Sequence, residues 1–246
     1  MSAPAPSMYS ENAQQLASRL GIEKGRANLD VFADTLQELA EADRDVLAVT
    51  SDSRGSGKIG PYGKALPEQI VEVGIAEQNL VGVAAGLAST GKTVFAVSPA
   101  CFLTARSFEQ VKNDVAYSDN PVTLVGISAG VSYGALGSTH HSLHDYAALR
   151  AVNNVTVVAP ADNYEAREAV KAAASMPTPV YLRFGKAPLY SLPGDDPFTP
   201  GSARLIRPGN DACFIASGET VIHALLAAAH LAETEGDRKS TRLNSS

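Results

Sequence analysis

The segment from Gln69 to Val97 constrains the fold more than any other part of the sequence. Gln69–Val73 is a short β-branched run that Gly74 interrupts, Asn79–Ser89 is small and apolar on every side, and Thr93–Val97 is a second apolar run. A helix without a polar face is expected to be buried. Two short apolar strands joined by a helix are typical of a parallel sheet with a crossover connection. We therefore predict a strand, a buried helix and a second strand here.

The same alternation of strands and helices runs along most of the chain. Further strands are expected at Val46–Thr50, Val122–Ile127, Val155–Val158 and Val180–Leu182. Amphipathic helices are expected around Asn12–Leu20, Leu29–Leu39, Thr104–Ala116 and Asp145–Val152, and from the Asp162-x-x-Glu165 capping box to Ala174. The pattern predicts an α/β fold, a doubly wound and mostly parallel sheet of five or six strands with helices on both faces.

Changes in composition divide the sequence into five parts. Residues 1–25 form an N-terminal lead, residues 26–187 carry the predicted sheet, and residues 188–210 are rich in Pro, Gly and Asp, as expected of an interdomain linker. Residues 211–236 add one strand and one helix, which we interpret as the truncated start of a second α/β domain. Residues 237–246, DRKSTRLNSS, resemble a translated sequencing-library adapter and are expected to be foreign to the fold.

Composition excludes several classes of function. The formal net charge is −6, which argues against a nucleic-acid partner because phosphate binding needs a basic face. The two cysteines, Cys101 and Cys213, fit a reducing compartment better than a disulfide scaffold. No apolar run approaches the ~18 residues of a membrane span, and the N-terminus lacks a signal pattern. We expect a soluble cytoplasmic protein that binds no membrane.

Two stretches carry residues with chemical potential. Glu77 stands where the first predicted strand meets the buried helix, and ligands of open α/β sheets bind at the carboxyl ends of strands. The alternative is an ordinary acidic residue in a first helical turn, which the helix dipole favours. The second stretch holds His140, His141 and His144. It lacks a nearby cysteine pair and a helical histidine pair with a supporting carboxylate, so we expect no metal ligands in it.

A longer sequence motif points to a family. The run Gly74-Ile75-Ala76-Glu77-Gln78-Asn79, followed by Gly82 and Ala85-Gly86-Leu87-Ala88, resembles the pyrimidine-binding domain of transketolase, in the version found in enzymes split into two subunits. The resemblance extends from Arg26 to Arg183 and resumes over residues 214–236. It implies that residues 26–187 are that domain and that the cofactor is thiamine diphosphate.

The resemblance assigns three residues to the cofactor. Glu77 takes the catalytic role of the glutamate that hydrogen-bonds the pyrimidine nitrogen and favours the tautomer that activates the cofactor. Phe102 falls where the family stacks an aromatic ring on the pyrimidine, although a Phe after an apolar strand is more often plain core. Arg106 is a weaker candidate, because it faces either the cofactor or Glu109 on its own helix.

Other residues match positions that bind the substrate or the partner. The word Gly-x-Thr-His assigns His140 to the donor sugar's hydroxyl and carbonyl groups, as a polarising or proton-relay group. Arg26, Ser56 and Arg183 fall on positions that hold a sugar phosphate, and guanidinium groups suit phosphate oxygens. Asp52 matches an acidic residue near the subunit interface. The resemblance gives His141 and His144 no role, and we expect them to be surface residues.

The sequence departs from the family at positions that recognise the substrate. The acidic pair before Gly-x-Thr-His is replaced by Ala135-Leu136, and Ser128 stands at the position of a phosphate-binding histidine. Transfer of a two-carbon ketol unit is therefore better supported than any particular sugar. We expect an unusual donor or acceptor.

The sequence also lacks half of a thiamine site. The Gly-Asp-Gly segment that normally holds the diphosphate and its magnesium ion is missing, and the nearest word is Gly194-Asp195-Asp196. We expect a separate N-terminal transketolase subunit to supply it, in an assembly of two copies of each chain. Two alternatives remain: the β subunit of a 2-oxo acid dehydrogenase E1 component, which lacks Gly-x-Thr-His, and a non-catalytic flavodoxin-like binding module.

Overall fold

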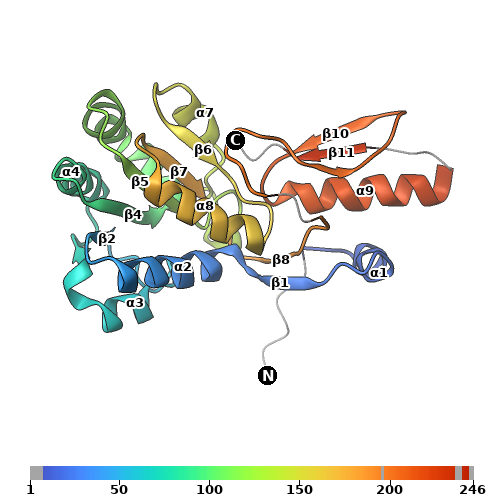
Figure 1. Cartoon of the computed structure of the whole chain (residues 1–246), viewed down its shortest axis with the longest axis horizontal. Helices are drawn as coiled ribbons and strands as arrows, with labels where there is room; N and C mark the ends of the chain where they lie inside the picture. Colours follow the sequence, from blue (N-terminus) through green and yellow to red (C-terminus); the bar gives the residue numbers. More distant parts are fainter. Residues whose placement is uncertain (1–7, 195–196, 236–239, 244–246) are drawn as a thin grey trace.

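The computed structural model describes residues 8–194, 197–235 and 240–243. A six-stranded sheet in the order β3-β2-β4-β5-β7-β6 has every neighbouring pair parallel. The strands are β2 (Val46–Thr50), β3 (Ile70–Glu72), β4 (Thr93–Pro99), β5 (Val122–Ile127), β6 (Thr156–Val158) and β7 (Val180–Arg183). The predicted fold class is confirmed (Figure 1).

Helices cover both faces of this sheet, as the alternation of side chains along β5 shows. Val125 and Ile127 pack into a buried cluster with the helices α2 and α8, whereas Val122 and Leu124 pack into another with α4. Successive side chains of a strand point to opposite faces, so the two clusters lie on opposite faces. The helices of the sheet region are α2 (Asn28–Ala42), α3 (Gly60–Ala65), α4 (Glu77–Ala88), α5 (Ala100–Ala105), α6 (Phe108–Gln110), α7 (Asp145–Arg150) and α8 (Asn163–Ser175).

The single helix predicted around Thr104–Ala116 is wrong in detail. The chain forms α5, breaks at Arg106 and Ser107, and continues through α6 into a π-helix at Val111–Tyr117. The Ser107 hydroxyl donates to the Leu103 carbonyl at 2.6 Å, and such back-bonding bends helices. Arg106 therefore stands at the C-terminal end of α5 and not in the middle of a longer helix.

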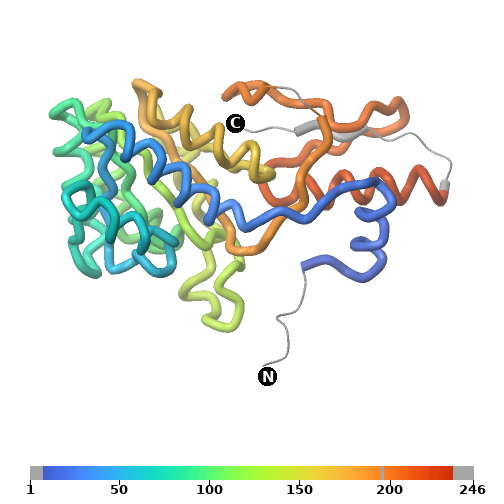
Figure 2. Tube along the Cα trace, turned by 60° about the horizontal axis from the view of Figure 1, so that its bottom comes forward, coloured from blue at the N-terminus to red at the C-terminus, as the bar shows by residue number. Residues whose placement is uncertain are grey.

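The carboxyl ends of the parallel strands meet at one edge of the sheet. There β2 leads into the loop 51–59, β4 into α5, β5 into the segment 128–144 and β7 into residues 184–187. In Figure 2 the yellow-green segment after β5 projects from the body of the fold. Polar and aromatic side chains on these four segments therefore gather where ligands of open α/β sheets bind.

The N- and C-terminal parts pack against each other beside the sheet. β1 (Lys24–Ala27) pairs antiparallel with β8 (Pro188–Tyr190), and α1 (Glu11–Arg19) lies against α9 (Thr220–Glu235). β9 (Leu205–Arg207), β10 (Cys213–Ala216) and β11 (Ser240–Leu243) form a second small sheet. Part of the proposed adapter-like tail thus forms β11, while residues 237–239 and 244–246 lie outside the described residues.

The described residues of the segment 188–210 form more regular structure and more contacts than its composition predicts. It carries β8 and β9, and its Arg204 forms an ion pair of 2.9 Å with Glu165, both side chains being buried. The Glu165 carboxylate also accepts from the Ala161 amide at 3.0 Å. Pro and Gly content favoured a linker, but this buried ion pair fastens the segment to the start of α8.

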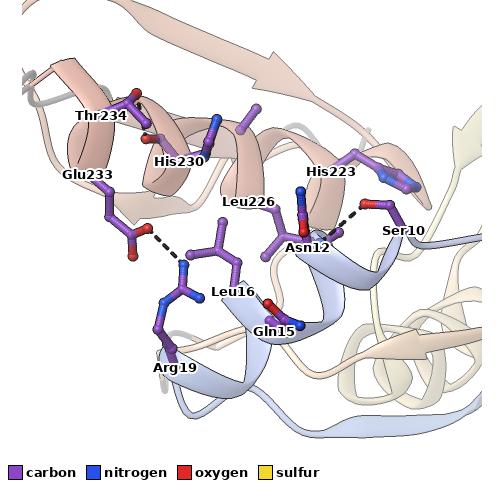
Figure 3. Close-up of a pocket in the computed structure, with 12 residues that line it drawn as sticks. Ser10, Asn12, Gln15, Leu16, Arg19, His223, Leu226, His230, Glu233 and Thr234 are labelled. Carbon is purple, nitrogen blue, oxygen red and sulfur yellow. Dashed lines mark hydrogen bonds and ion pairs between the residues drawn. The ribbon is translucent and has the colours of Figure 1, made fainter.

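A cavity of about 460 Å³ lies between α1 and α9. Leu16 and Leu226 face each other in it, and the ion pair of Arg19 with Glu233, at 2.8 Å, bridges the two helices (Figure 3). Its lining contains none of the candidate site residues. This cavity is therefore distinct from the carboxyl edge of the sheet, where Glu77 and the segment 128–144 lie.

Candidate active site

Glu77 is the first residue of α4 and is buried, with 2% of its surface exposed. Gly74, with a φ of +70°, lets the chain turn from β3 toward this helix, a backbone conformation that side-chain-bearing residues rarely adopt. The Glu77 carboxylate lies at the helix N-terminus, where the helix dipole favours a negative charge. The sequence predicted that Glu77 stands where β3 leads into this helix. Because its side chain is buried, Glu77 is not an ordinary solvent-exposed acidic residue of a first helical turn.

Arg106 joins Glu77 to Phe102. Its Nη1 donates to Glu77 Oε2 at 2.6 Å, and its guanidinium carbon lies 4.9 Å from the centroid of the Phe102 ring. The alternative pairing with Glu109 is not formed within the described residues. The arginine thus fixes one carboxylate oxygen at the start of α4 and stacks on the ring that the resemblance assigns to the cofactor.

His140 lies on the other side of Phe102. The two ring centroids are 5.3 Å apart in an edge-to-face arrangement, and Tyr133 meets His140 in the same way at 5.3 Å. The Thr139 hydroxyl is 3.0 Å from His140 Nδ1. These contacts hold the imidazole between two aromatic rings, and a row of contacts runs from the carboxylate of Glu77 to Tyr133.

A cavity of about 440 Å³ opens between α5 and the segment 128–144. It is lined by Cys101, Phe102, Ala105, Arg106, Ser138, Thr139, His141 and His144. The prediction that His141 and His144 are ordinary surface residues is incomplete, because both line this cavity and His144 Nε2 is 3.3 Å from the Thr104 hydroxyl. No group of three or more potential metal-ligating side chains occurs in the part of the chain that the structure describes.

Arg183 sits in a cluster that the sequence did not reveal. Its Nε donates at 2.7 Å to Asp145, a fully buried carboxylate, and its guanidinium stacks 4.5 Å from the centroid of the Tyr146 ring. Asp145 also accepts from the Tyr181 hydroxyl at 3.0 Å and from the Tyr146 amide at 3.0 Å. Burial, and then the charge of Asp145, raises the pKa of Tyr181 well above its usual value, so its hydroxyl remains a donor.

Arg26 and Ser56 lie apart from His140. Arg26 pairs with Asp34 at 2.7 Å and lines a cavity of about 300 Å³ together with residues of the loop after β2. The Ser56 hydroxyl donates to the Ser53 carbonyl at 3.3 Å in that loop. Among the described contacts, none joins these two residues to His140 or Arg183. Both remain at the carboxyl edge of the sheet.

Asp52 and Ser128 both adopt left-handed backbone conformations. Asp52 has a φ of +53°, and its amide donates to Glu72 at 2.7 Å. Ser128, at the end of β5, has a φ of +55° and is fully buried, and its hydroxyl makes no hydrogen bond within the described residues. Non-glycine residues in this conformation are concentrated at functional sites.

Comparison with known proteins decides the family. The sequence profile of the transketolase pyrimidine-binding domain matches residues 24–190. The chain belongs to this family. One of the subunits of an apulose-4-phosphate transketolase from Phocaeicola vulgatus is 51% identical over 204 residues, which are 82% of this chain and 65% of that protein.

Two further comparisons involve proteins described as parts of transketolases. A 6-deoxy-6-sulfo-D-fructose transketolase subunit from a Clostridium species is 35% identical over 82% of this chain and 63% of that subunit. A solved structure described as a split-gene transketolase in an inactive β4 tetramer matches with a TM-score of 0.81 at 34% identity, covering 90% of this chain and 72% of that one. The chain therefore spans less than two thirds of the two curated relatives.

The pyrimidine-domain residues fit the pyrimidine end of thiamine diphosphate. A buried carboxylate stands at a helix N-terminus, its Oε2 is fixed by Arg106, and a phenylalanine ring flanks the cavity nearby. The described hydrogen bonds engage Oε2 of Glu77 and none engages Oε1, so Oε1 would be the oxygen to accept from a pyrimidine nitrogen. The diphosphate end has no matching Gly-Asp-Gly segment anywhere in the sequence. The chain thus has the donor set for one end of the cofactor.

Proposed function

We propose that this chain is the C-terminal subunit of a split, thiamine diphosphate-dependent transketolase that moves a two-carbon ketol unit between sugar phosphates. The observation that carries the proposal is the row of contacts from Glu77 through Arg106 and Phe102 to His140. It joins a carboxylate suited to a pyrimidine nitrogen with an imidazole suited to a sugar. The contact of His140 with Phe102 favours this reading over the E1 β alternative, whose sequences lack Gly-x-Thr-His.

Glu77, Phe102 and Arg106 are proposed to bind and orient the cofactor. Glu77 hydrogen-bonds the pyrimidine nitrogen and shares a proton with it, Phe102 packs on the ring face, and Arg106 holds the carboxylate in place. When bound, thiamine diphosphate supplies the carbon nucleophile that takes up the ketol unit. A carboxylate excluded from water does not lose this hydrogen bond to competing solvent.

His140 and the cationic residues are proposed to bind the substrate. His140 hydrogen-bonds the carbonyl and hydroxyl of the donor, and Arg183 contributes a guanidinium whose position Asp145 fixes. Arg26, in β1, and Ser56, in the loop after β2, are proposed as phosphate contacts. Because relatives are named for a phosphorylated and a sulfonated sugar, the proposal extends to the class of anionic sugars and names no single one.

The second half of the site is proposed to come from an N-terminal transketolase subunit, which holds the diphosphate and a magnesium ion. The helix α4 was predicted to be buried on all sides, but Gln78, Asn79 and Gly86 are exposed, and Ile75 before it is 75% exposed. An exposed isoleucine beside two exposed amide side chains gives this face both an apolar and a polar contact for a partner chain. We propose that a second chain covers it, with Asp52 near that interface, in an assembly of two copies of each subunit.

The domain boundaries follow from this assignment. We propose residues 26–187 as the pyrimidine-binding domain and residues 211–236 as the beginning of the domain that follows it in transketolases. None of the helices in the described part of the chain has the length and apolar character needed to cross a membrane.

Reconstitution tests the proposal. The chain is mixed with the product of a neighbouring reading frame that contains Gly-Asp-Gly, and ketol transfer is followed by mass spectrometry with panels of ketose and aldose phosphates. We expect transfer only when both chains, thiamine diphosphate and magnesium are present. Transfer by this chain alone, or none by the mixture with any sugar of the panel, contradicts the proposal.

A further inference from the structure

Lys186 brings an exposed positive charge to the candidate site. It follows β7, and its ammonium lies 4.7 Å from the centroid of the Tyr133 ring. The same ring packs against His140 at 5.3 Å. Two segments that are distant in the sequence, residues 184–187 and 128–144, thus place a cation, an aromatic ring and an imidazole in succession.

Lys186 differs from Arg183 in having no acidic side chain as a direct partner among the described residues. Arg183 is 15% exposed and paired with buried Asp145 at 2.7 Å, so much of its charge is already offset. No acidic side chain of the described residues lies within 4.0 Å of the Lys186 ammonium. A charged ligand arriving at this edge therefore meets an available ammonium group at Lys186.

The loop that carries Tyr133 contains no compensating charge either. Residues 129–144 include no aspartate or glutamate, because Ala135-Leu136 occupies the place where the family carries an acidic pair. The Leu136 side chain is exposed, at 56%. A cation next to a loop without carboxylates attracts an anion more strongly than one surrounded by carboxylates.

We propose that Lys186, held over Tyr133, binds the anionic end of the sugar substrate, a phosphate or a sulfonate, while His140 contacts its other end. An ammonium presents three donors to such an oxyanion, and the face of the tyrosine ring holds the side chain in position. The inference rests on the proposed function and adds a residue for which neither the resemblance nor the sequence patterns gave a role.

Ligand binding to this chain tests the subsite without requiring turnover. The lysines are reductively dimethylated with ¹³C-labelled methyl groups, which keeps their charge, and their signals are observed by NMR. The Lys186 signal is the one that is missing from the spectrum of Lys186→Arg. Ring current from Tyr133 should shift this signal upfield, and Tyr133→Leu should remove that shift. Ribose 5-phosphate should move the signal, whereas uncharged ribose should not.

The ligand panel and two variants decide the outcome. Lys186→Met should weaken ribose 5-phosphate binding by about tenfold, as expected for loss of a charged hydrogen bond, while Lys171→Met on the exposed face of α8 should not change it. The affinities for a hexose with a sulfonate at C6 and for inorganic phosphate are also measured. Their comparison shows which anion the subsite accepts. A Lys186 signal that no anion moves, or unchanged affinity in Lys186→Met, overturns the inference.

Turnover by the reconstituted enzyme separates this inference from the proposed function. In an active complex, Lys186→Met should reduce the preference in kcat/KM for a phosphorylated over an unphosphorylated ketose by about tenfold, and Lys186→Arg should restore most of it. If the wild-type mixture transfers no ketol unit but Lys186 still binds ribose 5-phosphate, the function fails and the anion subsite stands. If transfer occurs with an unchanged preference, the function stands and the subsite fails.

Discussion

Replacing Asp145 with asparagine tests the cluster that holds Arg183. The carboxylate is fully buried and accepts three hydrogen bonds, two of them at Oδ2 from Arg183 Nε and the Tyr181 hydroxyl. The asparagine side chain would keep one acceptor oxygen, but its NH₂ group would face one of the groups that now donate to Asp145. The guanidinium of Arg183 would also lose its counter-charge. Removing one partner of a buried ion pair costs roughly 3–5 kcal/mol, and we expect about 3 kcal/mol because one acceptor remains.

The chain offers a matched control for this measurement. Asp34 pairs with Arg26 at the same distance, 2.7 Å, but both side chains are more than half exposed, at 52% and 58%. Asp34→Asn should therefore change the free energy of unfolding by less than about 0.5 kcal/mol.

Guanidinium unfolding of the full chain, followed by circular dichroism, gives both differences from the shift in midpoint at constant slope. A loss below about 1 kcal/mol for Asp145→Asn, or equal losses for the two variants, refutes the view that burial gives this cluster its importance.

Three further predictions concern packing, pH and the Glu77 ion pair. Gly126→Ala should destabilise the chain by about 1–3 kcal/mol in denaturant unfolding, because a methyl group at this buried position in β5 overlaps the ring of Tyr181. Burial raises the pKa of Glu219 above 4.5, so the folded state holds this proton more tightly than the unfolded state, and the free energy of unfolding falls as the pH rises above 4.5. Glu219→Gln should remove that part of the pH dependence in thermal unfolding. Arg106→Leu should cost about 1 kcal/mol, since Glu77 loses its partner but half of the arginine surface is exposed to solvent.

Each of these three has a contradicting outcome. If Gly126→Ala were as stable as the wild type, β5 or the Tyr181 ring would have to shift at no cost in free energy to make room for the methyl group. A Glu219→Gln chain with the wild-type pH profile would show that another group produces the slope. An Arg106→Leu chain of increased stability would indicate that the arginine strains α5 more than its ion pair stabilises the site.

The sequence predicted the central sheet well because its strands are short, apolar and buried. Val122–Ile127 was predicted with its observed bounds, and every residue of it is buried. A strand that is buried on both faces has a continuous apolar sequence, and such a short apolar run is easy to recognise. The helix after β4 was harder, because the hydroxyl of Ser107 turns to a backbone carbonyl and local periodicity does not record that bond. Likewise, composition does not reveal that Arg204 is buried against Glu165 within the segment 188–210.

Candidate site residues were predictable where a motif placed them and missed where tertiary contacts did. Glu77, Phe102, Arg106 and His140 were all singled out, and the structure brings them into one row of contacts. Asp145 was missed as a site residue because a carboxylate at the start of a helix is common. Its position beside three histidines was the available signal.

Cofactor binding by the assembled protein tests the central claim most directly. The affinity for thiamine diphosphate is measured by calorimetry, with magnesium, for the complex of this chain with the proposed Gly-Asp-Gly subunit and for complexes carrying Glu77→Ala or Glu109→Ala. Our account predicts binding by the wild-type and Glu109→Ala complexes, at least about tenfold weaker binding with Glu77→Ala, and none by the isolated chain. Unchanged affinity in the Glu77→Ala complex, or tight binding by this chain alone, would contradict it.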